Sequence, residues 1–242
     1  MRRIAAGLIV IMSVLLVSCK GKTGNTITVG SDKLDNTQSY FSESMHKAAR
    51  CDSGYYYLDK CGASADNLMF YDDKSEESIV LCNKPQCGHD GEECMAYISG
   101  SEFKSELYYY NSYIYMISSK GNLVRISADG TQRTDLGSIC VLSGQDSVSM
   151  CFNDGYAYVS QEITGDIEGN VTVRLHRFNL DTGLSDKIYE ETGYGIGINS
   201  LKTYGSDTFF LKTSVSKDDK GLYSLEGKGI FRITGEIGRA HV

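Results

Sequence analysis

The feature that most constrains the fold of this chain is a loose internal repeat of aromatic strand segments. Each copy places alternating aromatic and apolar residues directly after a small residue, as in Gly54-Tyr55-Tyr56-Tyr57-Leu58. Further copies begin at Ser112, Gly155 and Ser206. Alternation of this kind predicts antiparallel strands that are half-buried. The composition agrees, because 17 Tyr, 26 Gly and a single Pro suit short strands joined by tight turns.

Each aromatic segment is followed by a second strand segment and then by a turn signal such as Ala128-Asp129-Gly130-Thr131. The second segments span residues 67–72, 121–126, 173–178 and 229–233, and a third, shorter strand follows the first three copies at 79–81, 134–136 and 187–189. A period of roughly 40 to 50 residues with three or four strands per unit is typical of a β-propeller. We therefore predict an all-β fold of about four β-propeller blades over residues 51–236. A β-sandwich with evenly spaced hairpins is the alternative.

The N-terminus has the pattern of an export signal. Arg2 and Arg3 precede the apolar run Ile4–Val17, which is shorter than the roughly 20 residues that a membrane span needs. A basic start and a short apolar core predict a signal peptide over residues 1–18. The run ends in Leu16-Val17-Ser18-Cys19, which resembles the bacterial lipobox.

The lipobox resemblance implies a lipid anchor at Cys19. In proteins with this box, the chain is cut before the cysteine, and the new N-terminal cysteine carries acyl chains such as palmitate. Several buried acyl chains give firm anchoring, at about 0.8 kcal/mol per methylene. We expect residues 19–50 to hold the lipidated cysteine and a flexible tether, with the protein on the extracytoplasmic face of the cell membrane.

Charge argues against a nucleic-acid partner. The chain carries a net charge of −7, which becomes −9 when the two arginines of the predicted signal are removed. Binding to nucleic acid needs clusters of Lys and Arg for the phosphates, and the sequence contains no such cluster.

Two segments resemble a known group of proteins. Leu107–Tyr115 followed by Leu123–Thr131 resembles one blade of uncharacterised, Tyr-rich β-propeller-repeat lipoproteins of Gram-positive anaerobes. Leu81–Tyr97 resembles a Cys-rich loop of the same group. The resemblance covers about residues 54–233. It implies a fold and a location, and it implies no activity.

The strongest chemical cluster in the sequence is Cys82, Cys87, His89 and Cys94. Thiolates and imidazole are the usual zinc ligands, so a structural zinc site is one interpretation. The spacing lacks the tight Cys-x2-Cys knuckle, and an exported location favours disulfides. We therefore expect a disulfide in this loop before either a metal ion or free thiols, and we expect no cofactor other than this structural zinc.

The remaining cysteines offer two further pairs, Cys51 with Cys61 and Cys140 with Cys151. Seven cysteines remain besides Cys19, so at least one lacks a partner within the chain. Cys151, beside Phe152, also fits a small buried core residue.

Motifs of common enzymes are missing from the sequence. It contains no Gly-x-Ser-x-Gly elbow, His-Glu-x-x-His helix or phosphate loop. The glycines of residues 193–197 lie outside a strand-to-helix context and predict a connection between blades. His176 lies in an alternating segment and reads as a surface or blade-contact residue. We assign no catalytic residue, and an enzyme is the less favoured interpretation.

The C-terminal residues 237–242 suggest an artificial end. Ile237-Gly238-Arg239-Ala240-His241-Val242 back-translates to a string that resembles a common sequencing-library adapter. We interpret this segment as translated adapter and the propeller as incomplete, truncated at its C-terminus.

The sequence thus predicts an extracytoplasmic, lipid-anchored β-propeller that acts as a binding module for a glycan, a peptide or a protein. Propellers host many roles, so this step is an analogy from fold. One alternative is the propeller part of an extracellular enzyme, a hydrolase, lyase or peptidase gating domain, whose catalytic part is missing. Another is an envelope sensor or accessory protein. The ligand, the blade number and the oligomeric state stay open.

Overall fold

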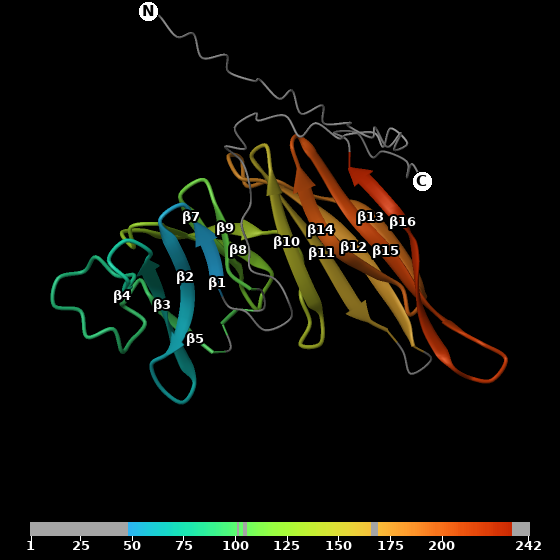
Figure 1. The fold of residues 1–242 in the computed structure, drawn as a ribbon, viewed down its shortest axis with the longest axis horizontal. Helices are drawn as coiled ribbons and strands as arrows, with labels where there is room; N and C mark the ends of the chain where they lie inside the picture. Colours follow the sequence, from blue (N-terminus) through green and yellow to red (C-terminus); the bar gives the residue numbers. More distant parts are fainter. Residues whose placement is uncertain (1–47, 101, 104–105, 166–168, 234–242) are drawn as a thin grey trace, which may run out of the picture. The chain divides into compact units, whose positions relative to one another are not determined.

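The computed structural model describes residues 48–100, 102–103, 106–165 and 169–233, which all fall in one compact unit of the chain (Figure 1). The predicted signal peptide, Cys19, the predicted tether up to residue 47 and the segment 237–242 lie outside the described residues. No helix in the described part of the chain is long and apolar enough to cross a membrane.

Within the described residues, sixteen strands form four antiparallel sheets that follow one another along the chain. Sheet 1 contains β1 (Ala48–Cys51), β2 (Gly54–Lys60), β3 (Ala65–Asp72), β4 (Glu77–Val80) and β5 (Tyr97–Ser99). Sheet 2 contains β6 (Tyr108–Tyr110), β7 (Tyr113–Ile117), β8 (Asn122–Ser127) and β9 (Arg133–Ser138). Sheet 3 contains β10 (Ser147–Asn153), β11 (Tyr156–Thr164), β12 (Asn170–Asn179) and β13 (Ser185–Tyr194). Sheet 4 contains β14 (Gly197–Tyr204), β15 (Asp207–Lys217) and β16 (Tyr223–Ile233).

This arrangement is that of β-propeller blades and confirms the predicted fold class. Within a sheet, strands pair in chain order, as in β6-β7-β8-β9, except that β5 pairs with β3. The first strands of neighbouring sheets contact one another, β1 with β6, β6 with β10, and β10 with β14. First strands that meet in this way are the inner strands of blades. The connection between sheets 3 and 4 passes through Gly195 and Ile196, as the glycine-rich segment predicted.

The small residues of the sequence repeat make tight turns between the first and second strands of a sheet. Asn111 and Ser112, between β6 and β7, have φ of 47° and 63°. Asp154 and Gly155, between β10 and β11, have φ of 46° and 77°. Two successive positive φ values define the two-residue hairpin turn whose twist matches that of the strands. Short polar residues and glycine tolerate this backbone, which explains why the aromatic strands β7 and β11 follow such residues.

Strand β7 of sheet 2 is buried on both faces, which corrects the half-buried strand expected there from the sequence. Ile114 and Met116 of β7 pack in the core shared with sheet 1, while Tyr115 and Ile117 pack in the core shared with sheet 3. Successive residues of a strand point to opposite faces. Because sheet 2 lies between two others, both sets of side chains are covered, and all four are at most 2% exposed.

The first strand of each sheet was not predicted as a strand. β1 begins at Ala48, inside the stretch expected to be tether, and β6 is only three residues long. β14 has a register shift between Asn199 and Lys202. Short or irregular strands of this kind carry little alternation, so the sequence pattern did not indicate them.

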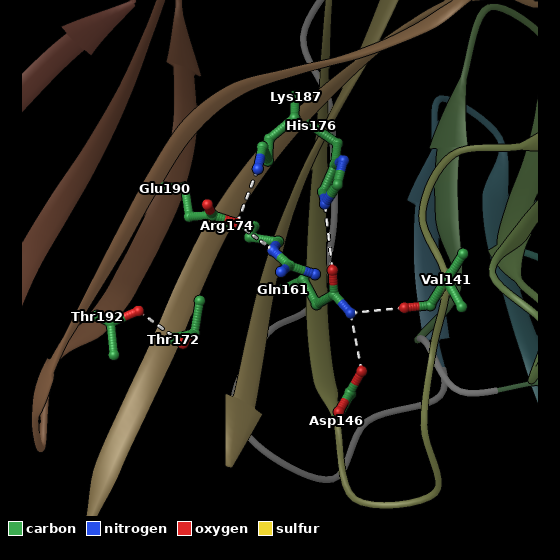
Figure 2. A network of polar contacts seen from close by, with 9 residues as sticks. All are labelled: Val141, Asp146, Gln161, Thr172, Arg174, His176, Lys187, Glu190 and Thr192. Atoms are coloured by element: carbon green, nitrogen blue, oxygen red, sulfur yellow. Dashed lines mark hydrogen bonds and ion pairs between the residues drawn. The ribbon is translucent and has the colours of Figure 1, made fainter. Parts of the chain in front are cut away.

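A buried polar network ties the connection between sheets 2 and 3 to sheet 3 (Figure 2). The side-chain amide of Gln161, 0% exposed, donates to the carbonyl of Val141 and to Asp146 Oδ2, both at 2.8 Å. Its oxygen accepts from His176 Nε2 at 3.1 Å. Burial, together with Arg174 and Lys187, lowers the pKa of His176, so its ring is neutral and donates from Nε2.

We expect Gln161→Leu to destabilise the protein by about 1 to 3 kcal/mol for each buried partner left without a hydrogen bond. The substitution keeps the size of the side chain but removes the three contacts of the amide. Urea unfolding followed by far-UV circular dichroism measures the change. Gln132→Leu is the matched control, because that side chain is exposed. Equal unfolding free energies for the two variants would contradict a structural role for the network.

Candidate metal centre

The Cys-rich loop is an insertion in the outer edge of sheet 1. β4 pairs with Met69–Asp72 of β3, and β5 pairs with Ala65–Asn67 of the same strand. The two short strands therefore act as one interrupted fourth strand, and residues 81–96 leave the sheet between them. Leu68 closes the neck of the loop, because its N–H donates to Ala96 O and its carbonyl accepts from Leu81 N–H, both at 2.8 Å. These two hydrogen bonds hold the beginning and the end of the loop side by side.

The loop brings together the four side chains that the sequence singled out. The sulfur atoms of Cys82, Cys87 and Cys94 and a ring nitrogen of His89 all lie within 4.8 Å of one another. His89 Nδ1 is 3.3 Å from Cys94 Sγ. Cys94 is 1% exposed and belongs to the core between sheets 1 and 2, whereas the other three are partly exposed. The group could hold a metal ion.

The four ligand atoms lie close enough together to approach a common centre. Zinc binds sulfur at about 2.3 Å and imidazole nitrogen at about 2.0 to 2.1 Å, so two sulfur ligands of a tetrahedral ion lie about 3.8 Å apart. A modest inward movement of side chains that already lie within 4.8 Å of one another would place them around one ion. A disulfide would instead require one pair of sulfur atoms at about 2.05 Å. All seven cysteines of the described residues are free. The disulfide expected in this loop is thus not formed in the structure, because the loop folds its four ligand atoms towards one point.

The pKa shifts of the thiols show an electrostatic conflict that a bound cation would relieve. Burial, the largest cause, and the neighbouring sulfur atoms of Cys82 and Cys87 together raise the pKa of Cys94 to about 11, against a hydrogen bond from the backbone N–H of Ala96. Burial also raises the pKa of Cys82, but the N–H of Lys84 and the neighbouring thiols outweigh it, and the net shift is downward. Packed thiols therefore resist becoming thiolates together. A bound cation removes this conflict, since a coordinating thiol is deprotonated.

The backbone of the loop supports the sulfur atoms. The N–H groups of Lys84 and Met95 donate to Cys82, and that of Ala96 donates to Cys94. Hydrogen bonds of this kind orient the ligand side chains of a metal site and adjust their basicity. Gln86 and His89 have φ of 59° and 57°, a left-handed backbone that residues other than glycine adopt at a cost. These two bends turn Cys87 and His89 back towards Cys82 and Cys94.

The other cysteine pairs of the sequence do not come together as disulfides. Cys51 is buried, and its thiol donates to Gly54 O at 3.5 Å, whereas Cys61 is exposed. Cys140 is buried between sheets 2 and 3, and Cys151 is buried between sheets 3 and 4. Cys151 has the core position that its neighbour Phe152 indicated.

Sequence reasoning missed a second feature, a polar groove on the inner strands of sheets 2 to 4. Its lining includes Glu162 of β11 and Lys202 of β14. Neither residue belongs to a motif, and they are brought together by strand order alone. The register shift of β14, which places Lys202, has no signal in the sequence.

Comparison with known proteins adds little to this description. No protein-family model matches the chain, and no curated protein matches it. Among solved structures, the chain is similar to an oligogalacturonate lyase from Vibrio parahaemolyticus, with a TM-score of 0.42 and 11% sequence identity. The match covers 79% of this chain and 52% of the lyase, so the chain spans about half the length of that protein.

Proposed function

We propose that this chain is a membrane-anchored extracytoplasmic lipoprotein whose β-propeller serves as a binding module stabilised by a structural zinc ion. The observation that carries the proposal is the lipobox pattern Leu16–Cys19 ahead of a propeller that begins at Ala48. A lipid on Cys19 would hold the propeller at the membrane surface, joined by the segment between them. Propeller loops and inner strands offer recognition surfaces without a catalytic group, which suits binding.

Zinc is the proposed ion for Cys82, Cys87, His89 and Cys94 because of the chemistry of these donors. Three thiolates and one imidazole are soft and borderline ligands, which select zinc over calcium or magnesium. Four protein ligands complete a tetrahedron and leave no open position, as in structural zinc sites. The ion would clamp an insertion that has no strand or helix of its own.

We expect the lipid anchor to depend on Cys19 alone. The full gene is expressed in a bacterium that processes lipoproteins and is fed an alkyne analogue of palmitate. Wild type and Cys61→Ala should incorporate the label and partition into the detergent phase, and Cys19→Ala should do neither. Cys61 is the matched control because its thiol is exposed in the described residues. Label on Cys19→Ala, or its absence from wild type, would overturn the membrane assignment.

A further inference from the structure

The inner strands of sheets 2, 3 and 4 line a groove of about 490 Å³. It is bounded by β10 and β14, with Tyr108 of β6 at one end. First strands of blades surround the central channel of a propeller, where ligands bind in many such folds. The volume lies within the roughly 300 to 1,000 Å³ of small-molecule sites. Most of the lining is polar and includes Ser147, Ser149, Ser160, Glu162, Asn199 and Lys202.

The walls of the groove are held in place by hydrogen bonds between sheets. Tyr108 Oη accepts from the N–H of Met150 at 3.0 Å and joins sheet 2 to sheet 3. Glu162 Oε1 accepts from the N–H of Ile198 at 3.1 Å and joins sheet 3 to sheet 4. These bonds fix the lining before any ligand arrives, and a fixed site loses less conformational entropy on binding.

A β-bulge in β14 shapes one wall. Asn199 pairs with Leu211, but Lys202 pairs with Phe209, so β14 contains one residue more than β15 over this stretch. In a regular strand, residues three apart point to opposite faces. The extra residue lets both Asn199 and Lys202 line the groove. Ser200, inside the bulge, has φ of 53°, and bulges with such backbone occur often beside binding sites.

Two charged groups of opposite sign line the groove. Glu162 is partly buried, and this burial raises its pKa against hydrogen bonds from Ile198 N–H and Ser147. Lys202 is exposed, and partial desolvation lowers its pKa. The partly buried carboxylate gains from polar ligand atoms that replace lost hydration, and the exposed ammonium can donate to the same ligand.

We infer that this groove is the recognition site of the binding module and that it takes a neutral, hydroxyl-rich ligand, a saccharide. Sugar hydroxyls both donate and accept, and the lining offers matching serine hydroxyls, an amide, a carboxylate and an ammonium. The lining carries two carboxylates, Glu106 and Glu162, and one ammonium, Lys202; a single net negative charge repels a polyanion and is too small to select a polycation. Val148, which is partly exposed, adds apolar surface for sugar C–H groups. The inference rests on the proposed binding function and names its site and ligand class.

Titration of the full-length protein with sugars tests the inference. The protein is kept in a zwitterionic detergent without a sugar headgroup, and saturation-transfer NMR and calorimetry are recorded with cellotriose, maltotriose and chitotriose. A heparin tetrasaccharide and spermine represent anionic and cationic ligands. We expect at least one neutral trisaccharide to bind. Glu162→Gln and Lys202→Met should each weaken binding about tenfold or more, since each removes a charged hydrogen-bonding partner.

Matched controls separate binding from folding. Glu77→Gln and Lys120→Met change exposed side chains outside the groove and should keep wild-type affinity. Glu162→Gln keeps an oxygen that accepts from Ile198 N–H, so its unfolding midpoint should stay close to that of wild type. Binding only of heparin or spermine, no binding at all, or affinity unchanged in both groove variants would overturn the inference. Lipid labelling at Cys19 without sugar binding would support the membrane anchor and contradict the saccharide site. Sugar binding without lipid labelling would support the saccharide site and contradict the membrane anchor.

Discussion

Replacing Cys94 with serine is expected to abolish zinc binding and to lower the free energy of unfolding by at least about 4 kcal/mol, the range in which lost metal sites fall. Cys94 is the innermost ligand, 1% exposed and packed in the core between sheets 1 and 2. Binding of structural zinc contributes about 10 to 16 kcal/mol to the folding free energy of small zinc peptides. Even part of that energy would be the largest contribution to the stability of this loop. The corresponding fall in Tm is roughly 8 to 16 °C for a chain of this size.

The measurement combines metal analysis with thermal unfolding. Purified wild type should contain a stoichiometric amount of zinc, and a strong chelator should lower its Tm. Cys94→Ser should contain none, and the chelator should leave its Tm unchanged. Iron in place of zinc would give a coloured protein and would correct the identity of the ion. An intact mass that indicates a disulfide, without metal, would restore the disulfide expected from the sequence.

Two control cysteines distinguish ligation from packing. Cys61→Ser changes an exposed thiol close to the same sheet and should alter neither zinc content nor Tm. Cys151→Ser changes a fully buried thiol between sheets 3 and 4 and should lower Tm while zinc content and the chelator response persist. If Cys94→Ser behaves like Cys151→Ser, Cys94 is a core residue and no ligand.

The blade pattern could be predicted from the sequence because its second strands repeat an aromatic run behind a small residue and are followed by a further strand and a turn signal. Residues such as Tyr56 and Leu68 are buried where these strands cross the shared core. The first strands escaped prediction because their environment is set by neighbouring sheets. β10 has Met150 and Phe152 in one core and Cys151 in the other. Such a continuous buried run does not reveal a period of two.

The four residues of the candidate metal centre could be identified from the sequence, but their arrangement in space could not. Cys82, Cys87, His89 and Cys94 are separated by spacers that match no common knuckle. Their convergence depends on the left-handed backbone at Gln86 and His89 and on the neck at Leu68. None of these contacts is encoded by a local propensity. The export expected from the signal pattern favoured a disulfide, whereas the structure brings together four side chains that could hold a metal ion.

Phe152→Ala tests whether neighbouring sheets depend on each other for burial, as blades of a propeller must. Phe152 is 0% exposed, and its ring stacks on Tyr110 at a centroid distance of 5.1 Å and lies 4.5 Å from that of Tyr115. Those tyrosines belong to sheet 2, whereas Phe152 belongs to sheet 3. We expect a loss of about 3 to 5 kcal/mol, equivalent to a fall in Tm of roughly 6 to 20 °C.

Urea unfolding with both tyrosine fluorescence and far-UV circular dichroism measures this loss and its cooperativity. Tyr204→Ala removes an aromatic ring that is 64% exposed and should change stability by no more than about 0.5 kcal/mol. Zinc content should persist in Phe152→Ala, because the metal ligands lie in the insertion of sheet 1. A loss below about 1 kcal/mol would mean that sheets 2 and 3 do not share a packed core, since filled cores lose several times that energy when a phenyl ring is deleted.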